Sequence, residues 1–355
     1  MARVGILGLP NVGKTTLFNA LTGLGATTAA HPFSTTEPNI GVARVPNERL
    51  DRLAALEGSA KTTHATLELL DLPALTGPAG GMGARYLGRL REMEALALVL
   101  RAFHDDAVSD VESGTDPATQ AESLLLELTL ADAEVFGRRA AKAAKEAMSD
   151  AGLRRAAEAI TRATAHLDSG SPLRSASWSE QEFEAFRDLA PLTLKPAVWV
   201  VNVDEGVGGD QSGAVASVVP DRDPIVVLSA RIEEEAAQLD PADRSDLLEG
   251  LGLGEGALAT MVRATYEALG LLAFFTVGPK ESHAWTVRAG TAAAEAAGKV
   301  HSDFERGFIR AEVAPIDVVL EAGGWDAAKA AGSVRLEGRD YVVAEGDVLL
   351  VRFSV

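Results

Sequence analysis

The segment of residues 8–15 combines residue types that can bind a phosphate chain. It reads Gly8-Leu9-Pro10-Asn11-Val12-Gly13-Lys14-Thr15, which matches the GxxxxGK[S/T] pattern of a P-loop. Glycines at both ends let the backbone approach a ligand closely, because no Cβ stands in the way. Lys14 can bridge the outer phosphates, and the Thr15 hydroxyl can bind Mg²⁺. We therefore predict a site for a Mg²⁺-bound nucleoside triphosphate.

Backbone amides are expected to supply most of the phosphate contacts. Pro10 has no N–H, so the donors follow it in the chain: Asn11, Val12, Gly13, Lys14, Thr15 and Thr16. They open a helix, whose N-terminus favours negative charge. The apolar run 3–7 predicts a buried strand, and residues 16–23 have helical apolar spacing and a closing glycine. The alternative is a glycine turn that precedes a helix by chance. That alternative does not explain why a predicted strand and a predicted helix both flank the loop.

Two further segments offer oxygen ligands to Mg²⁺. Residues 30–41 contain two prolines and a hydroxyl cluster, which predict a loop. Thr35 there supplies a second hydroxyl if the segment is a nucleotide switch, and nothing if it is a plain surface loop. Residues 66–71 predict a strand that ends in Asp71, which either holds Mg²⁺ through water or caps the next turn. The catalytic candidates are Lys14, Thr35 and Asp71, and the metal ligands are Thr15 and Thr35.

Two later strands end where a purine base would bind. Residues 195–201 and 224–228 are apolar runs followed by polar residues, and open parallel sheets bind ligands at the carboxyl ends of their strands. Asn202 can tie the P-loop to this edge, and the Glu205 carboxylate can accept hydrogen bonds from a purine. A backbone amide after the second strand can also meet the base. The candidate residues are Asn202, Val203, Glu205, Ser229 and Ala230.

Composition limits the class of protein. The chain of 355 residues is longer than one compact core usually holds, so two or three domains are expected. It has no cysteine, which excludes disulfides and thiolate metal sites. Because no signal peptide or membrane-spanning run is recognisable, we expect a cytoplasmic protein with no membrane partner. The net charge of −18 opposes indiscriminate nucleic-acid binding, and no sequence-specific DNA partner is expected.

The order of the patterns predicts an α/β fold, a doubly wound and mostly parallel sheet of the P-loop NTPase kind. We expect this domain to comprise residues 1–104 and 194–270. Residues 105–193 interrupt it with an Ala-, Leu- and charge-rich helical hairpin, whose basic residues form either a solvated face or a partner surface. Residues 271–355 predict a small α+β module. Its expected strands are 273–277, 284–287, 340–343 and 348–353, with a helix at 291–300.

Taken together, these motifs resemble the YchF/Obg-like ATPases, a branch of the Obg-related P-loop GTPases, over nearly the whole chain. The matching segments are 8–16, 32–35, 38–41, 202–206, 229–230, 297–312 and 335–343. The resemblance implies a Mg²⁺-dependent nucleotide hydrolase with a coiled-coil insertion and a C-terminal TGS domain, which is a ubiquitin-like β-grasp. It also implies binding to the ribosome, through the large subunit or the whole particle. We expect the insertion and the C-terminal module to form the docking surface.

The resemblance also bears on substrate and rate. Residues 202–205 have the family's NxxE form instead of the NKxD motif that reads guanine, which implies ATP, with GTP kept open. Ala74 replaces the glycine of the second switch, Asp110 stands where the family has a histidine, and the loop 76–84 is shorter by about three residues. Leu75 matches the apolar residue by which the family replaces a water-orienting glutamine.

These departures leave two functions open. The first is a ribosome-associated switch that hydrolyses ATP, or GTP if this is the preferred base. The second is a nucleotide-gated binding module with little hydrolysis. A small-molecule kinase would need an acceptor site and an arginine-rich lid, and neither is evident in the sequence.

Overall fold

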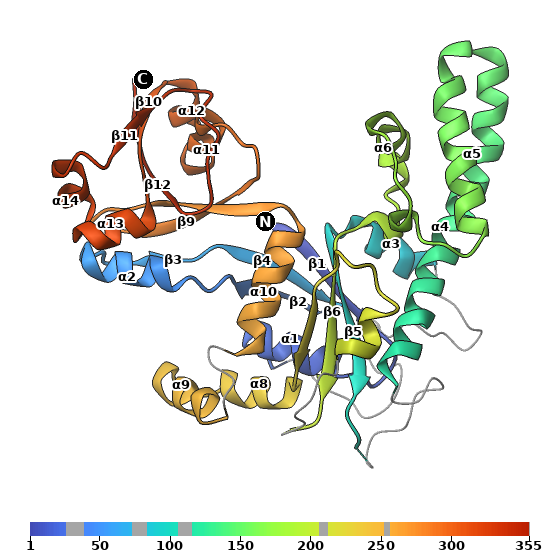
Figure 1. Cartoon of the computed structure of the whole chain (residues 1–355), viewed down its shortest axis with the longest axis horizontal. Helices are drawn as coiled ribbons and strands as arrows, with labels where there is room; N and C mark the ends of the chain where they lie inside the picture. Colours follow the sequence, from blue (N-terminus) through green and yellow to red (C-terminus); the bar gives the residue numbers. More distant parts are fainter. Residues whose placement is uncertain (26–38, 73–83, 106–115, 206–211, 252–255, 355) are drawn as a thin grey trace. The chain divides into compact units, whose positions relative to one another are not determined.

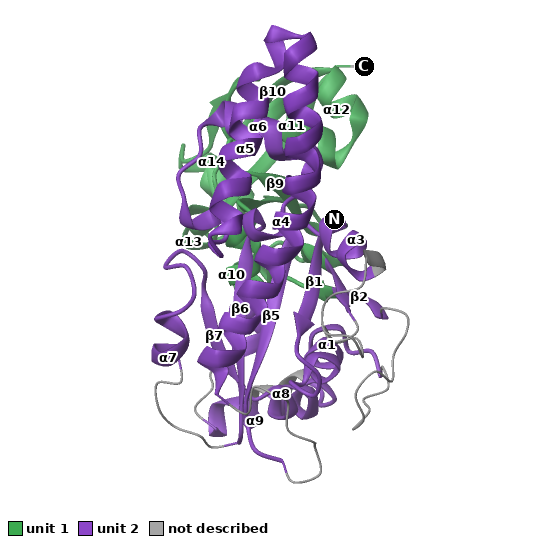
Figure 2. Cartoon of the chain, turned by 90° about the vertical axis from the view of Figure 1, so that its right-hand side faces the viewer, with its two compact units in different colours: residues 1, 43–67, 262–355 green, residues 2–42, 68–261 purple. Residues whose placement is uncertain are grey.

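The computed structural model describes residues 1–25, 39–72, 84–105, 116–205, 212–251 and 256–354. The chain divides into two compact units (Figure 2). Unit 2 contains residues 2–42 and 68–261, and unit 1 contains residues 1, 43–67 and 262–355. These units cut the chain differently from the three domains expected from the sequence, whose boundaries stay predictions.

Unit 2 is built on a six-stranded sheet with the order β2-β4-β1-β5-β6-β7 (Figure 1). The neighbours β1 and β5, β5 and β6, and β6 and β7 are parallel. All seven residues of β6 are buried, as expected for a parallel strand that is covered on both faces. The strands are β1 (Ala2–Gly8), β2 (Asn39–Arg44), β4 (Thr66–Asp71), β5 (Ala95–Ala102), β6 (Ala197–Val203) and β7 (Ile225–Leu228). The predicted α/β class is confirmed.

Helices connect these strands. The first, α1, follows the P-loop and ends at Gly23, whose left-handed φ of 67° lets its N–H bond back to the Asn19 carbonyl at 2.8 Å. The Asn19 side chain donates to Glu234 at 2.8 Å and so joins α1 to α8. The helices are α1 (Lys14–Thr22), α3 (Ala84–Glu92), α7 (Ser212–Ala216), α8 (Ala230–Ala237) and α9 (Pro241–Gly250). A further helix, α10 (Ala257–Ala268), begins in unit 2 and continues into unit 1 after Met261.

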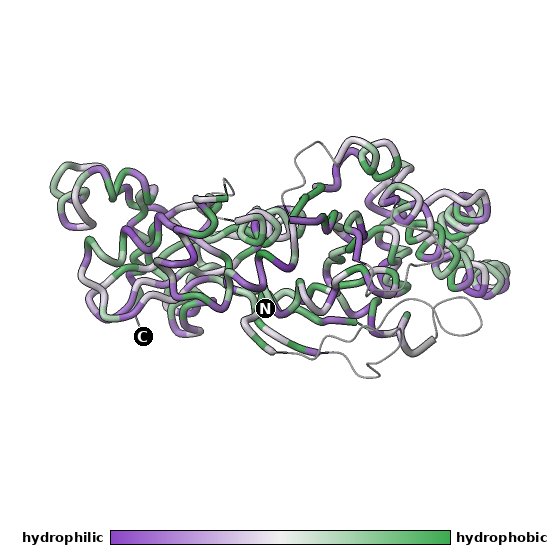
Figure 3. The backbone as a smooth tube through the Cα atoms, turned by 90° about the horizontal axis from the view of Figure 1, so that it is seen from below, coloured by the Kyte–Doolittle hydropathy of each residue, from purple (hydrophilic) through white to green (hydrophobic). Residues whose placement is uncertain are grey.

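The predicted helical hairpin is formed by α4 and α5 (Figure 1). Asp116 starts α4 by accepting from the amides of Ala118 and Thr119, and Pro117 occupies the first turn. Apolar and polar stretches alternate along the tube (Figure 3), and the apolar side of the hairpin packs on α6, where the Phe136 and Phe186 rings are 5.4 Å apart. The elements are α4 (Pro117–Ser149), η1 (Ala151–Leu153), α5 (Arg154–Asp168), η2 (Leu173–Ser175), α6 (Glu180–Phe186), η3 (Arg187–Leu189) and η4 (Leu192–Leu194).

A buried carboxylate fixes the base of this hairpin. Asp132 on α4 is fully buried and accepts from Arg91 of α3 at 2.8 Å. It also accepts from the Leu192 amide at 3.0 Å and from both the amide and the hydroxyl of Thr193 at 2.8 Å. Because the Asp132 carboxylate is fully buried, these bonds fix the geometry, and loss of one partner is expected to be costly.

Unit 1 is an α+β unit with the sheet order β11-β10-β12-β8-β9-β3, in which β10 pairs antiparallel with β11 and β12, and β8 pairs antiparallel with β9. Its core gathers Phe274, Val287, Val313 and Leu349 with four alanines of α11. The strands are β3 (Thr62–Thr63), β8 (Leu271–Thr276), β9 (Ser282–Arg288), β10 (Phe308–Pro315), β11 (Arg335–Glu337) and β12 (Asp347–Phe353). The helices are α2 (Glu48–Leu56), α11 (Ala293–Val300), α12 (Ser302–Arg306), α13 (Ile316–Ala322) and α14 (Trp325–Ala330).

The expected strand at 340–343 is wrong. This segment makes an isolated bridge between Val342 and Ala292. The Ala293 amide bonds to the Tyr341 carbonyl at 2.7 Å, and the Val343 amide bonds to the Thr291 carbonyl at 3.0 Å. The backbone groups of this segment therefore bond to residues at the start of α11 and not to a neighbouring strand. Within the described residues, no helix combines the length and apolar composition that crossing a bilayer requires.

Candidate functional site

The P-loop joins the end of β1 to the start of α1. Asn11 and Gly13 have left-handed φ angles of 60° and 92°, which turn the chain back towards the helix. A Cβ at Gly8 would lie 2.5 Å from the Val99 carbonyl oxygen, and one at Gly13 would overlap the Asn202 amide nitrogen. Both glycines are therefore required by packing against neighbouring strands as well as by the approach of a ligand.

The helix leaves several P-loop amides outside its own hydrogen-bond ladder. The Leu17 amide donates a hydrogen bond to the Gly13 carbonyl at 2.9 Å. The amides of Lys14, Thr15 and Thr16 belong to the first turn, where a helix has no intrahelical acceptors for them. This arrangement, together with the helix dipole, suits an anion.

Lys14 is held in a buried position. Its side chain is largely enclosed, and the ammonium donates to the Leu9 carbonyl at 2.7 Å. Burial lowers the pKa of Lys14 from 10.5 to about 8, and the nearby Asp71 carboxylate acts in the opposite direction. An anion placed at this ammonium would restore the charged form, so the site favours a negatively charged ligand.

Asp71 gathers polar groups from three elements. Its Oδ2 accepts from the Thr15 hydroxyl at 2.8 Å and from the Asn39 amide group at 3.2 Å. Burial raises the pKa of Asp71, and hydrogen bonds from Thr15 and Asn39, followed by the Lys14 charge, act to lower it. Thr15 and Asp71 are thus brought together from α1 and β4. Asn39, the first residue of β2, was not singled out from the sequence as a partner of Asp71.

Asn202 links the P-loop to the far side of the site. Its Nδ2 donates to the Val12 carbonyl at 3.0 Å, and its Oδ1 accepts from the Ala230 amide at 2.9 Å. Both bonds are buried. The Ala230 amide is therefore already engaged, so an amide that meets a base must come from a neighbour such as Ser229.

Glu205 lies beyond the end of β6, and half of its side chain is exposed. It pairs with Arg231 of α8 at 3.3 Å, a partner that the sequence patterns did not suggest. Val203 closes β6 and is buried. Thr35 and the residues that depart from the family pattern, Ala74, Leu75 and Asp110, lie outside the described residues.

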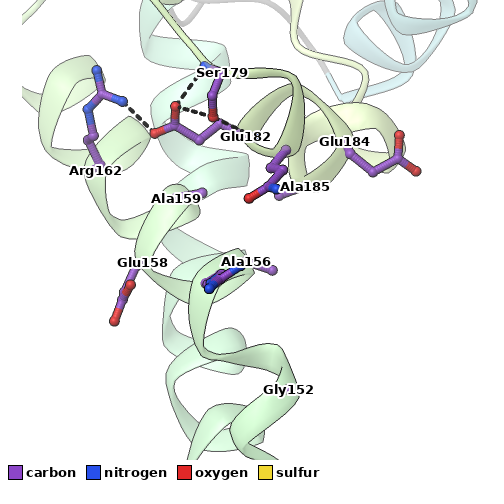
Figure 4. A pocket seen from close by; sticks show the side chains of 11 residues that line it. Gly152, Ala156, Glu158, Ala159, Arg162, Ser179, Glu182, Glu184 and Ala185 are labelled. Carbon is purple, nitrogen blue, oxygen red and sulfur yellow. Dashed lines mark hydrogen bonds and ion pairs between the residues drawn. The ribbon is translucent and has the colours of Figure 1, made fainter.

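A separate cavity of about 450 Å³ lies between α5 and α6 (Figure 4). Among its charged groups, Glu182 pairs with Arg162 and completes a capping box with Ser179. Glu158 and Glu184 also line it. Arg155 lines the cavity as well, so the charge of the lining is mixed. The glycine-rich loop at the start of α1 has the phosphate-binding pattern and remains the candidate nucleotide site.

Comparison with known proteins supports the same view. The family model described as "50S ribosome-binding GTPase" matches residues 3–129. The YchF-GTPase_C model, described as "Protein of unknown function (DUF933)", matches residues 271–354. The curated "Ribosome-binding ATPase YchF" of Bacillus subtilis is 40% identical over 363 residues and is covered to 99%, as is this chain. The chain belongs to the YchF family.

Other YchF-family proteins are similar over the same extent. "Obg-like ATPase 1" of Pongo abelii is 35% identical, with 99% of this chain and 92% of that protein covered. The solved "Structure of the Schizosaccharomyces pombe YchF GTPase" is similar with a TM-score of 0.85 and 28% identity, over 99% of this chain and 97% of that one. The resemblance stated from the motifs is confirmed, and so is the fold class that it implies.

Proposed function

We propose that this chain is a ribosome-associated switch that binds and hydrolyses ATP with Mg²⁺, and that GTP is a secondary substrate. One observation carries the proposal: Lys14, Thr15 and Asp71 converge at the N-terminus of α1, beside amides that the helix leaves available. The names of the relatives, ribosome-binding ATPases, support the same reaction and partner.

The residues fit Mg²⁺. The cluster offers a hydroxyl and a carboxylate, which are hard oxygen donors. Mg²⁺ usually takes one or two protein oxygens and completes its shell with phosphates and water. Thr15 and Thr35 would bind it directly, and Asp71 would hold one of its waters. When bound, the metal neutralises charge that develops on the phosphates.

The chain's own groups would do the rest. The amides from Asn11 to Thr16 and the Lys14 ammonium would hold the phosphates and stabilise transition-state charge. The Glu205 carboxylate would accept from an amino group of the base, and a backbone amide beside Ser229 would contact the base edge. The pairing of Glu205 with Arg231 at 3.3 Å supports this role, because it would restrain the carboxylate beyond the end of β6.

Partner binding is proposed on two surfaces. The hairpin of α4 and α5 and the C-terminal module of residues 271–355 would contact the ribosome, in the cytoplasm. We also retain the division into a nucleotide domain of residues 1–104 and 194–270, a helical insertion of residues 105–193 and a TGS domain. If a chain without both surfaces still co-sedimented with ribosomes as the full chain does, this assignment would be wrong.

A second candidate is a nucleotide-gated binding module with little hydrolysis. It is favoured by Ala74, Leu75 and Asp110, because none of them is a usual water-positioning group. Single-turnover hydrolysis of ATP separates the two. Phosphate release above the rate without protein, abolished by Lys14→Ala, supports the enzyme. Nucleotide binding with no release supports the binding module.

A further inference from the structure

The buried face of α3 lies against the strands that carry the nucleotide site. A Cβ added at Gly5 of β1 would meet Met93 at 3.0 Å, Leu72 at 3.2 Å and Leu90 at 3.7 Å. Leu90 and Met93 therefore pack on β1 beside the residue that follows Asp71. Tyr86 precedes Leu90 by four residues, so it lies on the same face of α3, one turn nearer to the start of the helix.

The Tyr86 hydroxyl is buried and has no hydrogen-bond partner among the described residues. It is close enough to Asp71 for the carboxylate to raise the pKa of Tyr86, an effect second to burial. A buried hydroxyl without a partner costs free energy and calls for a physical reason.

The other residues with an unpaired buried side-chain atom in the described part of the chain each make a bond through another atom of the same side chain; for Arg101, Nε donates to the Phe103 carbonyl at 3.1 Å. Glu233 has an unpaired oxygen, but its other oxygen accepts from the Ala257 amide at the start of α10. His64 has an unpaired Nδ1, but its Nε2 bonds to Asp51 at 3.0 Å. The hydroxyl is the only polar atom on the Tyr86 side chain, so no second bond explains its burial.

We propose that Tyr86 is a positioning residue of the nucleotide site, whose hydroxyl donates a hydrogen bond to the charged oxygens assembled beside Asp71 when the Mg²⁺-nucleotide binds. The inference rests on the proposed nucleotide binding. It assigns a ligand-dependent partner to a group that has no described partner of its own. Hydroxyl donors to charged oxygens form the stronger class of hydrogen bond.

This bond would attach the start of α3 to the nucleotide. The end of α3 is already fixed, because Arg91 bonds to Asp132 at 2.8 Å and to the carbonyls of Ala131 and Ala190 at 3.0 Å. Nucleotide binding would then hold α3 at both ends, between the phosphate site and the base of the helical hairpin.

The test compares two tyrosine variants that each lose only a hydroxyl. Tyr86→Phe removes the unpaired group. Tyr266→Phe removes a hydroxyl that donates to Thr286 at 2.8 Å, in unit 1. For each full-length protein, calorimetry gives the Kd of a non-hydrolysable ATP analogue with Mg²⁺, and thermal denaturation without nucleotide gives the Tm.

The two variants should each change a different quantity, the Kd for one and the Tm for the other. Tyr86→Phe should weaken binding of the analogue about ten- to a hundredfold and leave the Tm of the nucleotide-free protein unchanged or higher. Tyr266→Phe should lower the Tm and leave the Kd unchanged. A wild-type Kd for Tyr86→Phe, or a lower Tm without nucleotide, would overturn the assignment. If the wild-type protein bound no nucleotide, the proposed function itself would have failed, which is a distinguishable result.

Discussion

The buried ammonium of Lys14 leads to a prediction about protons. Its pKa is lowered to about 8 by burial, whereas a phosphate chain beside it would favour the charged form and raise the pKa again. Nucleotide binding should therefore take up a proton whenever Lys14 is neutral beforehand. Raising the pH from 7 to 9 is the perturbation that reveals this.

The size of the effect follows from the pKa of Lys14. With a value of about 8, about a tenth of the free protein has a neutral Lys14 at pH 7 and about nine tenths at pH 9. Uptake should thus rise from about 0.1 to about 0.9 proton per nucleotide. By linkage, the affinity should fall nearly tenfold per pH unit near pH 9.

Calorimetry in buffers of different ionisation enthalpy measures the uptake directly. Both pH values lie above the last phosphate pKa of about 6, so the nucleotide contributes little. Lys14→Arg is the control, since arginine stays protonated throughout and its residual binding should take up no proton. Uptake by the wild-type protein below about 0.2 at pH 9 would refute the reasoning.

The same pKa predicts the stability of the nucleotide-free protein. A lysine whose pKa is lower in the folded than in the unfolded state destabilises the fold at low pH, and this cost disappears as the pH rises from about 8 to 10.5. The difference between the two pKa values corresponds to a cost of about 3 kcal/mol, and the hydrogen bond to Leu9 offsets about 1 kcal/mol of it. Lys14→Met should therefore be more stable than wild type by about 2 kcal/mol at pH 7 in urea denaturation, with the gain shrinking towards pH 10.

Three further variants, two of them with a matched control variant, test packing in the site and at the base of the helical hairpin. Gly13→Ala should abolish nucleotide binding in calorimetry, because its Cβ overlaps Asn202, whereas Gly23→Ala, which meets nothing within 4 Å, should cost about 1 kcal/mol in stability and leave binding intact. Asn202→Ala breaks two buried bonds and should lower the free energy of unfolding by about 2–4 kcal/mol in urea; a change under about 0.5 kcal/mol would contradict it. Asp132→Ala should cost about 3–5 kcal/mol, whereas Glu134→Ala on the exposed side of α4 should cost less than about 0.5, so equal effects would count against the buried anchor.

The sequence predicted those parts of the site whose geometry is set by local rules. A glycine-rich loop between a strand and a helix fixes the position of Lys14, and parallel strands end at one edge, so Asp71 and Asn202 were expected there. The Thr15–Asp71 bond joins residues 56 positions apart. Their proximity could be predicted because the strand before the P-loop and the strand that ends in Asp71 finish at the same edge of the sheet.

The features that the sequence did not predict depend on contacts without a local pattern. Residues 43–67 join unit 1 through pairs such as Arg49 with Asp317 at 3.2 Å and Ser59 with Ser282 at 2.8 Å. Nothing in the composition of that segment distinguishes it from the rest of the nucleotide domain. Tyr86 belongs to no motif in the sequence, and only the absence of a described partner for its buried hydroxyl sets it apart.

The most direct test of nucleotide binding is calorimetric titration of the full chain with ATP and with GTP, each with Mg²⁺. The account predicts saturable one-to-one binding, tighter for ATP than for GTP, that Lys14→Ala abolishes. A wild-type protein that shows a cooperative thermal transition and yet binds no purine triphosphate would contradict it.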